Sequence, residues 1–229
     1  WVDVIELLAR YPVAPTKGPG VLTFSGGFCA IAHDYFEALD MEMPALTERT
    51  RSELAPQLPV FIPPRNPLDL GTQAIFQPEL IPLGTNALMA DGNLGSVLIA
   101  INSGTAASQR GYGPMFIESL KGKDRPAIMA FPAPELDADF EASVRANRLI
   151  LSRSIERSMT ALSRITRHGR SLQRSARSVT HTPFADLPAL GRGPQPEWLG
   201  KQLLSAMGIR VPAGGLATSL EEAEATAAK

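Results

Sequence analysis

The chain has 229 residues, 44% of them hydrophobic, and its 22 Lys and Arg nearly balance its 23 Asp and Glu. This length is enough to bury a real core, so a mini-protein is excluded. The single cysteine, Cys29, excludes an intrachain disulfide framework and a zinc ribbon. No apolar run reaches the ~18 residues of a spanning helix, and the first residues lack the pattern of a signal peptide. We therefore expect a globular protein of the cytoplasm with no membrane partner.

Two shifts in composition divide the chain. Residues 145–177 contain nine Arg and one acid, Glu156, so this stretch carries a charge of about +8 and the rest about −9. Residues 178–196 contain four Pro and two Gly without a helical or strand period, which indicates a linker. We predict a domain over 1–177, a linker over 178–196 and a short α/β appendage over 197–229. Because the chain begins at Trp1 and ends within a helical pattern, we expect a piece of a longer protein.

Short apolar runs alternate with helical patterns in the first domain. A strand over 21–24 ends in Ser25-Gly26-Gly27 and leads into a helix whose apolar face carries Phe28, Ile31, Tyr35 and Leu39. Thr47 caps a polar helix over 48–58. Further strands are predicted at 96–101, 126–131 and 149–151, and further helices at 79–90, 115–121 and 137–146. A long helix follows, with Ile155, Met159, Leu162 and Ile165 on one apolar stripe.

The appendage is predicted to contain two helices. The first covers 197–207 and is ended by Gly208, and the second follows a Ser219 cap. In the first domain the strands are continuously apolar, which indicates burial on both faces and a parallel sheet with helices on each side. We therefore predict a doubly wound α/β fold of the flavodoxin-like kind.

In such a sheet ligands bind at the carboxyl ends of the strands, which points to two loops. The first loop, Ser25, Gly26, Gly27 and Phe28, and the second, Asn102, Ser103, Gly104 and Thr105, each precede a predicted helix. Free backbone N–H groups at a helix N-terminus favour an anion, so a phosphate could bind at either loop. The glycines could equally serve only to let strand and helix pack closely, and the sequence leaves both readings open.

Other residues have a structural and a functional interpretation. Asn66-Pro67 and Asp69 form a turn, and Asn66 or Asp69 could also support the Gly26 loop. Cys29 and His33 have a spacing that a metal would accept, but no further ligand accompanies them, so no metal site is predicted. Cys29 is expected to be a core thiol, although a helix N-terminus tends to lower a thiol pKa. The Arg-rich stretch is expected to be a solvated or domain-facing surface. A nucleic-acid interface there would show salt-sensitive binding.

The order of motifs resembles a known family. Gly20-Val-Leu-Thr-Phe-Ser-Gly-Gly-Phe28, Leu46-Thr-Glu-Arg-Thr50 and Arg65-Asn-Pro-Leu-Asp-Leu70 resemble the ligase-CoA domain of the NDP-forming (ADP-forming) acyl-CoA synthetases, relatives of succinyl-CoA synthetase. Leu199-Gly-Lys-Gln-Leu-Leu-Ser-Ala-Met-Gly-Ile-Arg-Val-Pro212 resembles the opening of the ATP-grasp domain in fused members. Phe28 and Gly71-Thr72 depart from the common pattern.

The resemblance implies a reaction that joins a carboxylic acid to CoA with ATP and Mg, through an acyl phosphate and a phosphohistidine. One helix N-terminus from this chain, at Ser25–Phe28 or at Asn102–Thr105, would face the phosphohistidine. That histidine, the CoA-binding domain and most of the ATP-grasp domain are implied to be partners in the same enzyme, since none of the three histidines here stands in the family's loop. The chain alone is therefore expected to be inactive and to contain no catalytic residue.

A rival interpretation from another class is a non-catalytic flavodoxin-like binding or interaction module. It is disfavoured because the strand ends carry neither a hydroxyl-rich phosphate loop nor clustered acids. We expect no nucleic-acid partner and leave a homo-oligomer open. The acid, ATP against GTP, and which loop faces the phosphohistidine are also left open by the sequence.

Overall fold

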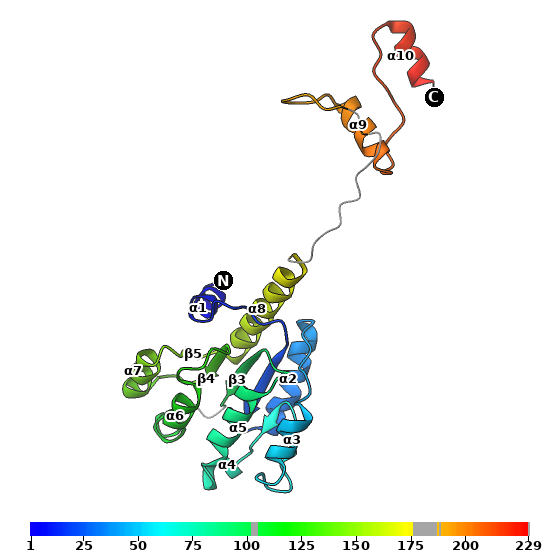
Figure 1. The fold of residues 1–229 in the computed structure, drawn as a ribbon. Helices are drawn as coiled ribbons and strands as arrows, with labels where there is room; N and C mark the ends of the chain where they lie inside the picture. The colour runs from blue at the N-terminus through cyan, green and yellow to red at the C-terminus, as the bar shows by residue number, and fades with distance from the viewer. Residues whose placement is uncertain (102–104, 176–186, 188, 229) are drawn as a thin grey trace. The chain divides into compact units, whose positions relative to one another are not determined.

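The computed structural model describes residues 1–101, 105–175, 187 and 189–228, and the chain forms two compact units, Trp1–Arg177 and Ser178–Lys229. The first unit contains a five-stranded sheet in the order β2-β1-β3-β4-β5, with every neighbouring pair parallel (Figure 1). The strands are β1 (Pro19–Thr23), β2 (Leu68–Asp69), β3 (Ser96–Ala100), β4 (Ala127–Ala130) and β5 (Ile150–Ser152). This strand order is that of a flavodoxin-like doubly wound fold, and the predicted fold class is confirmed.

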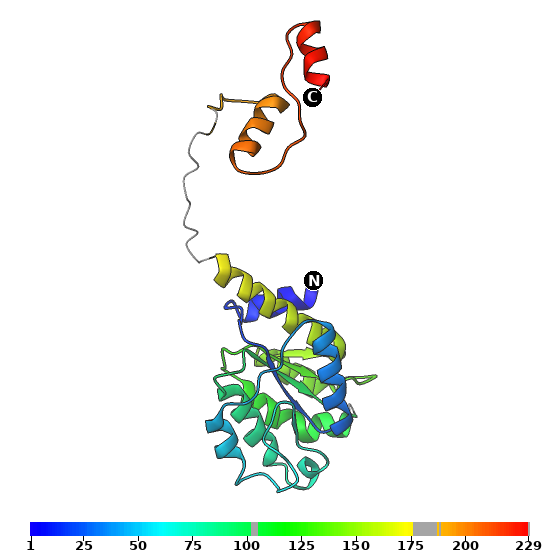
Figure 2. The same cartoon turned by 90° about the vertical axis from the view of Figure 1, so that its right-hand side faces the viewer.

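Helices cover both faces of the sheet. One layer contains α1 (Val2–Arg10), α2 (Gly26–Ala38) and α8 (Ile155–Ser175). The other contains α3 (Glu48–Leu54), α4 (Gln73–Phe76), α5 (Leu80–Ala90), α6 (Ala106–Leu120) and α7 (Ala138–Ala146). In Figure 2 the dark-blue α1 and the yellow α8 lie above the sheet, and the cyan and green helices lie below it.

Successive residues of each central strand are buried in opposite layers. Val21 and Leu98 pack with the α1, α2 and α8 layer, whereas Leu22 and Ile99 pack with the α3 to α7 layer. This alternation with period 2 is what a pleated strand imposes, and burial on both faces requires apolar side chains at every position. The continuous apolar runs of the sequence therefore follow directly from the position of these strands inside the sheet.

Several predicted elements are confirmed with small changes of boundary. Thr47 caps α3, but this helix ends at Leu54 rather than at residue 58. The stripe of α8 is buried as predicted, with Ile155, Met159, Leu162 and Ile165 in the core. The predicted face of α2 is wrong at Ile31, which is exposed, because the buried positions are Phe28, Cys29, Ala32 and Phe36. An i, i+4 stripe starting at Phe28 would have found this face.

The prediction for α6 is wrong at its start, since the helix begins at Ala106 rather than at residue 115. Gly111, Gly113 and Pro114 lower the helix propensity of its first half. Packing outweighs that propensity: a Cβ on Gly113 would overlap the ring of Phe140 on α7, so the glycine lets the two helices approach closely. The elements α1, α4 and β2 are additions that the sequence interpretation did not include.

The second unit contains α9 (Glu197–Ala206) and α10 (Leu220–Ala227), close to the predicted helices. Gly208 ends the first helix at φ 78°, with Ile209 N–H bonded to Leu204 O at 3.0 Å. Ser219 Oγ accepts the N–H of Glu222 as the predicted cap. No side chain is buried among the described residues of this unit, so those residues by themselves form no hydrophobic core.

Within the described ranges, no helix is long and apolar enough to cross a membrane.

Candidate functional site

On the carboxyl edge of the sheet, the neighbouring strands β1 and β3 lead into helices of opposite layers. After β1 the chain enters α2 in one layer, and after the neighbouring β3 it enters α6 in the other layer. The two strand ends therefore form a topological switch point, the place where open α/β sheets usually bind their ligands. The first predicted loop, Ser25–Phe28, follows β1 at this point, and Thr105 of the second precedes α6.

The N-terminus of α2 has two hydrogen-bond donors that no described residue uses. Ser25 Oγ accepts the N–H of Phe28 at 3.3 Å, and Ser25 O accepts the N–H groups of Phe28 and Cys29 at 3.0 and 3.3 Å. The N–H groups of Gly26 and Gly27 make no hydrogen bond to any residue that the structure describes. The helix therefore presents two free donors at the end where its dipole is positive.

The N-terminus of α6 repeats this arrangement. Thr105 Oγ1 accepts the N–H of Ser108 at 3.1 Å, and Thr105 O accepts the N–H of Gln109 at 3.0 Å. Within the described ranges, the N–H groups of Ala106 and Ala107 have no acceptor. Asn102, Ser103 and Gly104 lie outside the described residues, so only Thr105 of the second predicted loop is placed here.

Asp69 lies against the α2 terminus. An ideal Cβ on Gly26 would be 3.1 Å from Asp69 Oδ2, whereas one on Gly27 would meet only Ser25 Oγ at 3.8 Å. Asp69 Oδ1 accepts the N–H of Gly71, at 2.8 Å, and Gly71 has a φ of +55° that favours glycine. The absence of a side chain at Gly26 thus lets the carboxylate approach the first turn of α2.

The Cys29 thiol is buried in that first turn and is free. Burial raises its pKa, the negative charge of Asp69 raises it further, and Arg65 partly opposes both. The expectation of a core thiol is confirmed, and the lowering that a helix N-terminus would cause is overcome by burial. Cys29 therefore has the properties of a packing residue and not of a nucleophile.

Asn66 lies at a different place from the loop. Its Oδ1 accepts the N–H of Val21 at 2.9 Å, and its Nδ2 donates to Pro19 O at 3.0 Å and to Pro44 O at 2.9 Å. The side chain thereby acts as a short piece of neighbouring strand beside the first half of β1. The Asn66–Pro67 peptide bond is cis. Of the two residues considered as loop support, Asp69 is the one beside Gly26.

A hollow of about 340 Å³ lies next to Asp69, at the carboxyl end of β2. Its lining includes Phe61, Arg65, Asp69, Gly71 and Gln73. Arg65 is exposed and makes no hydrogen bond or ion pair with a described residue. The hollow thus combines an apolar wall with one unpaired cation beside the α2 terminus.

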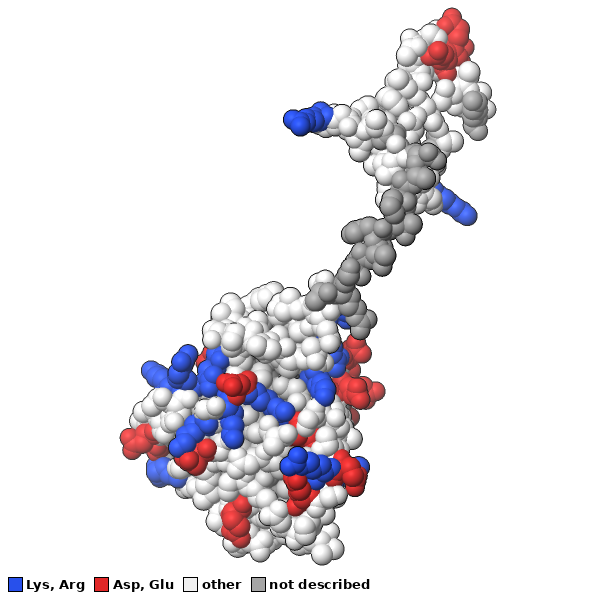
Figure 3. All heavy atoms as spheres, in the orientation of Figure 1, with Lys and Arg blue, Asp and Glu red and all other residues white. Residues whose placement is uncertain are grey.

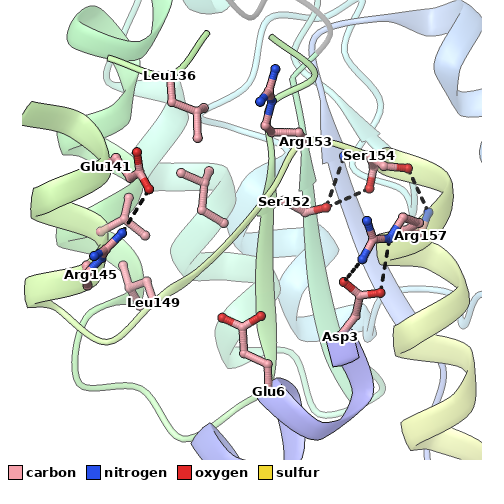
Figure 4. A pocket seen from close by; sticks show the side chains of 12 residues that line it. Asp3, Glu6, Leu136, Glu141, Arg145, Leu149, Ser152, Arg153, Ser154 and Arg157 are labelled. Carbon is pink, nitrogen blue, oxygen red and sulfur yellow. Dashed lines mark hydrogen bonds and ion pairs between the residues drawn. The ribbon is translucent and has the colours of Figure 1, made fainter. Parts of the chain in front are cut away.

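A second hollow, of about 440 Å³, lies along the outer edge of β5 (Figure 4). Its charged side chains are largely paired: Arg157 with Asp3 at 2.7 Å and Arg145 with Glu141 at 3.1 Å. Arg153 donates to Ala133 O at 3.0 Å and to Pro134 O. Because each guanidinium here already has acceptors, this hollow offers no free arginine to an anion. It is also separated from β1 by β3 and β4.

The Arg-rich stretch is mixed with acids in space. Figure 3 shows Lys and Arg side chains gathered on the left of the first unit, with Asp and Glu among them. Asp3 of α1 forms an ion pair with Arg157, and Glu141 of α7 forms one with Arg145. The charge segregation of the sequence is therefore partly cancelled by folding. Across the described part of the chain, no group of three His, Cys, Asp or Glu side chains could hold a metal ion.

Comparison with known proteins shows what the chain is similar to. No family model matches it. A curated relative, trans-feruloyl-CoA synthase FCS1 from an unknown prokaryotic organism, is 26% identical over 230 residues, which cover 98% of this chain. The resemblance to acyl-CoA synthetases is confirmed. The chain spans 32% of the length of that relative.

Two solved structures are similar in fold. One is the dinucleotide-forming acetyl-coenzyme A synthetase 1 of Ca. Korarchaeum cryptofilum in complex with phosphate and ADP, with a TM-score of 0.63 and 20% identity. That match covers 77% of this chain and 39% of the synthetase. The other, PH0766 from Pyrococcus horikoshii OT3, has a TM-score of 0.61 and 18% identity over 75% of this chain and 41% of its own.

Proposed function

We propose that this chain is part of an acid–thiol ligase that forms an acyl-CoA from a carboxylic acid, CoA and ATP, through an acyl phosphate and a phosphohistidine. In this proposal the first unit supplies a helix N-terminus to the site of phosphoryl transfer. The observation that carries the proposal is the pairing of α2 and α6, which present free N–H groups at the switch point between β1 and β3. The relative named feruloyl-CoA synthase supports the class of reaction.

The chain's own residues would act on the transferred group by electrostatics. A helix N-terminus carries roughly half a positive charge, and an anion there is stabilised by about 0.3–1 kcal/mol, or up to ~2 kcal/mol when partly buried. Hydrogen bonds from the N–H groups of Gly26 and Gly27 to a phosphoryl oxygen would add about 1.5–3 kcal/mol each. Both donors are fixed before the anion arrives, so holding it requires little reorganisation.

The substrates that carry the chemistry are assigned to other parts of the enzyme. The described residues offer no cluster of carboxylates for Mg²⁺, and the sequence has no G-x-x-x-x-G-K-[ST] phosphate loop for ATP. In line with the family resemblance, we assign Mg–ATP, CoA and the phosphohistidine to further domains of the same polypeptide or its partners. The chain by itself is then a non-catalytic part of the ligase.

We further propose that residues 197–229 begin an ATP-grasp domain, after a linker over 178–196. The second unit leaves Met207, Ile209 and Leu220 exposed and buries no described side chain, as expected of a domain whose core is completed by further chain. The alignment with the feruloyl-CoA synthase covers 98% of the chain, so it includes residues of the second unit.

The test measures phosphoryl transfer in the complete enzyme. Gly26→Val should slow phosphorylation of the histidine by at least tenfold, because its side chain would meet Asp69 and distort the first turn of α2. Gly111→Ala on α6 is the control, since a Cβ there meets no atom within 4 Å. Gly104→Val tests the second loop in the same assay. Normal transfer in both valine variants would contradict the assignment of these loops.

The activity itself is tested with the chain and the complete enzyme side by side. Incubation with ATP, CoA and a panel of carboxylic acids should yield acyl-CoA and ADP with the complete enzyme and no product with the 229-residue chain. Turnover by the chain alone, or no acyl-CoA from the complete enzyme with any acid, would refute the proposal.

A further inference from the structure

Four large apolar side chains project into solvent near the carboxyl end of β2. Val60 is 105% exposed, Phe61 72%, Ile75 52% and Phe76 77%. We call this set the apolar rim. Single exposed apolar residues are common on protein surfaces, but several aromatic and aliphatic side chains in two neighbouring segments are typical of an interaction surface.

The two segments of the apolar rim border the same hollow, the one next to Asp69. Phe61 and Gln73, the first residue of α4, both line that hollow, and α4 ends in Ile75 and Phe76. Figure 1 shows α4 at the lower end of the first unit, beside the cyan segments that follow α3. Asp69 also lines this hollow, and its Oδ2 is the atom that a Cβ on Gly26 would meet at 3.1 Å, so the hollow lies close to the α2 terminus.

Buried residues next to the apolar rim keep its side chains exposed. Ile62 is buried between the loop and the core, and Ala74 is fully buried in the single turn of α4. Because these neighbours fix the backbone, Phe61 and Phe76 cannot turn inward without removing Ile62 or Ala74 from the core. The fold therefore presents the apolar rim outward in its native state.

We propose that the apolar rim is the docking surface for a second domain of the same enzyme, the domain that brings the phosphoryl group to the α2 terminus. This inference rests on the proposed function. The chain aligns over 98% of its length with a relative of which it spans only 32%. About two thirds of that relative therefore lies outside the alignment. A domain that delivers an anion to Gly26 and Gly27 would pass close to Asp69, which lines the hollow that the apolar rim borders.

The chemistry of the docking face follows from these residues. Four apolar side chains favour apolar partners, and the guanidinium of Arg65, which no described residue pairs with, favours an acidic or phosphorylated group opposite it. Apolar contact would exclude water from the α2 terminus, which strengthens the interaction between the anion and the N–H groups of Gly26 and Gly27. Docking and phosphoryl binding are thereby coupled at one edge of the sheet.

Hydrogen exchange provides the first test. Peptides covering residues 58–64 and 72–77 should exchange at least about tenfold more slowly in the complete enzyme than in the 229-residue chain, because docking covers them. Equal exchange in the two proteins would overturn the proposal. This comparison does not depend on turnover, so it remains decisive even where no acyl-CoA is formed.

A double variant provides the second test. Phe61→Ser with Phe76→Ser should lower acyl-CoA formation by the complete enzyme about tenfold or more, as loss of two aromatic contact residues does at other interfaces. Its unfolding transition as the 229-residue chain should stay unchanged, because both rings are exposed. Val13→Ser is the matched control, since Val13 is 82% exposed in the segment before β1.

The outcomes separate this inference from the proposed function. Acyl-CoA formation at the normal rate by the double variant would overturn the docking surface and leave the ligase function intact. No acyl-CoA from the unmodified enzyme would overturn the ligase function, and the exchange comparison then decides the docking surface by itself. Concentration-dependent dimerisation of the 229-residue chain that the double variant abolishes would assign the apolar rim to a second copy and overturn the proposal.

Discussion

Replacement of Asn66 by alanine should be among the most destabilising single changes in the first unit. The side chain is 9% exposed and makes three hydrogen bonds to backbone groups: the N–H of Val21, the carbonyl of Pro19 and the carbonyl of Pro44. Alanine would leave all three groups without their partner beside the core strand β1. Each buried backbone group that loses its partner costs about 1–3 kcal/mol. The three together should lower the free energy of unfolding by about 3–9 kcal/mol.

Urea unfolding of the 229-residue chain, followed by circular dichroism, measures this change. The slope of the free energy with urea should stay the same, so that the shift of the midpoint reports stability alone. Asn93→Ala is the matched control, because its Nδ2 makes one exposed hydrogen bond, to Ala45 O at 3.0 Å. That variant should lose about 0.5–1.5 kcal/mol. A loss for Asn66→Ala below about 1.5 kcal/mol, or no larger than that of the control, would refute the account of Asn66 as a substitute for a neighbouring strand.

Three further predictions follow from particular contacts. Burial of Asp91 would raise its pKa, but hydrogen bonds from nearby hydroxyl and backbone N–H groups outweigh burial and hold the pKa below its usual value. The stability that these bonds provide is therefore present above the ordinary carboxyl pKa and is lost as the pH falls through the lowered pKa of Asp91. Urea unfolding between pH 7 and pH 3 should show that the free energy of unfolding of Asp91→Asn depends less on pH than that of the unmodified chain. Gly113→Ala should lose about 1–3 kcal/mol of unfolding free energy through overlap with Phe140, whereas Gly111→Ala on the same helix should gain about 0.5–1 kcal/mol; equal effects on the urea midpoint would contradict the packing argument. Cys29, buried and with a raised pKa, should react with a thiol reagent at pH 7 far more slowly in the native chain than in urea, and equal rates would show that the first turn of α2 is open.

Helix caps and core stripes were predictable because their signals are local. Ser25, Thr47 and Ser219 each accept the N–H three residues ahead, as a capping side chain does in any sequence context. The face of α2 was placed incorrectly at Ile31. A spacing of four residues from Phe28 would have given the buried positions Ala32 and Phe36. The start of α6 could not be predicted from its glycines and proline, since what stabilises that half of the helix is contact with Phe140 of α7.

The candidate site was predictable in kind but not in detail. The prediction that a ligand binds near Ser25–Phe28 and Asn102–Thr105 came from the positions of the strand ends. Which of these groups bind the ligand stays a prediction. The role of Asn66 was hidden, because its three partners come from residues 22 to 47 positions away in the sequence. β2 was also missed: two residues are too few to show a period, and the pairing of Leu68 with Leu22 defines the strand.

The sequence by itself determined the layered parallel sheet, because strands buried on both faces need apolar residues at every position, and it determined the resemblance to acyl-CoA synthetases through ordered motifs. Tertiary structure decided which loops share an edge and which charges cancel. It alone placed Asp69 against Gly26, paired Arg157 with Asp3 across 154 positions, and gathered Phe61 and α4 around one hollow. These are non-local contacts, whose geometry is set by the packing of whole elements and leaves no periodic trace in the residues that make them.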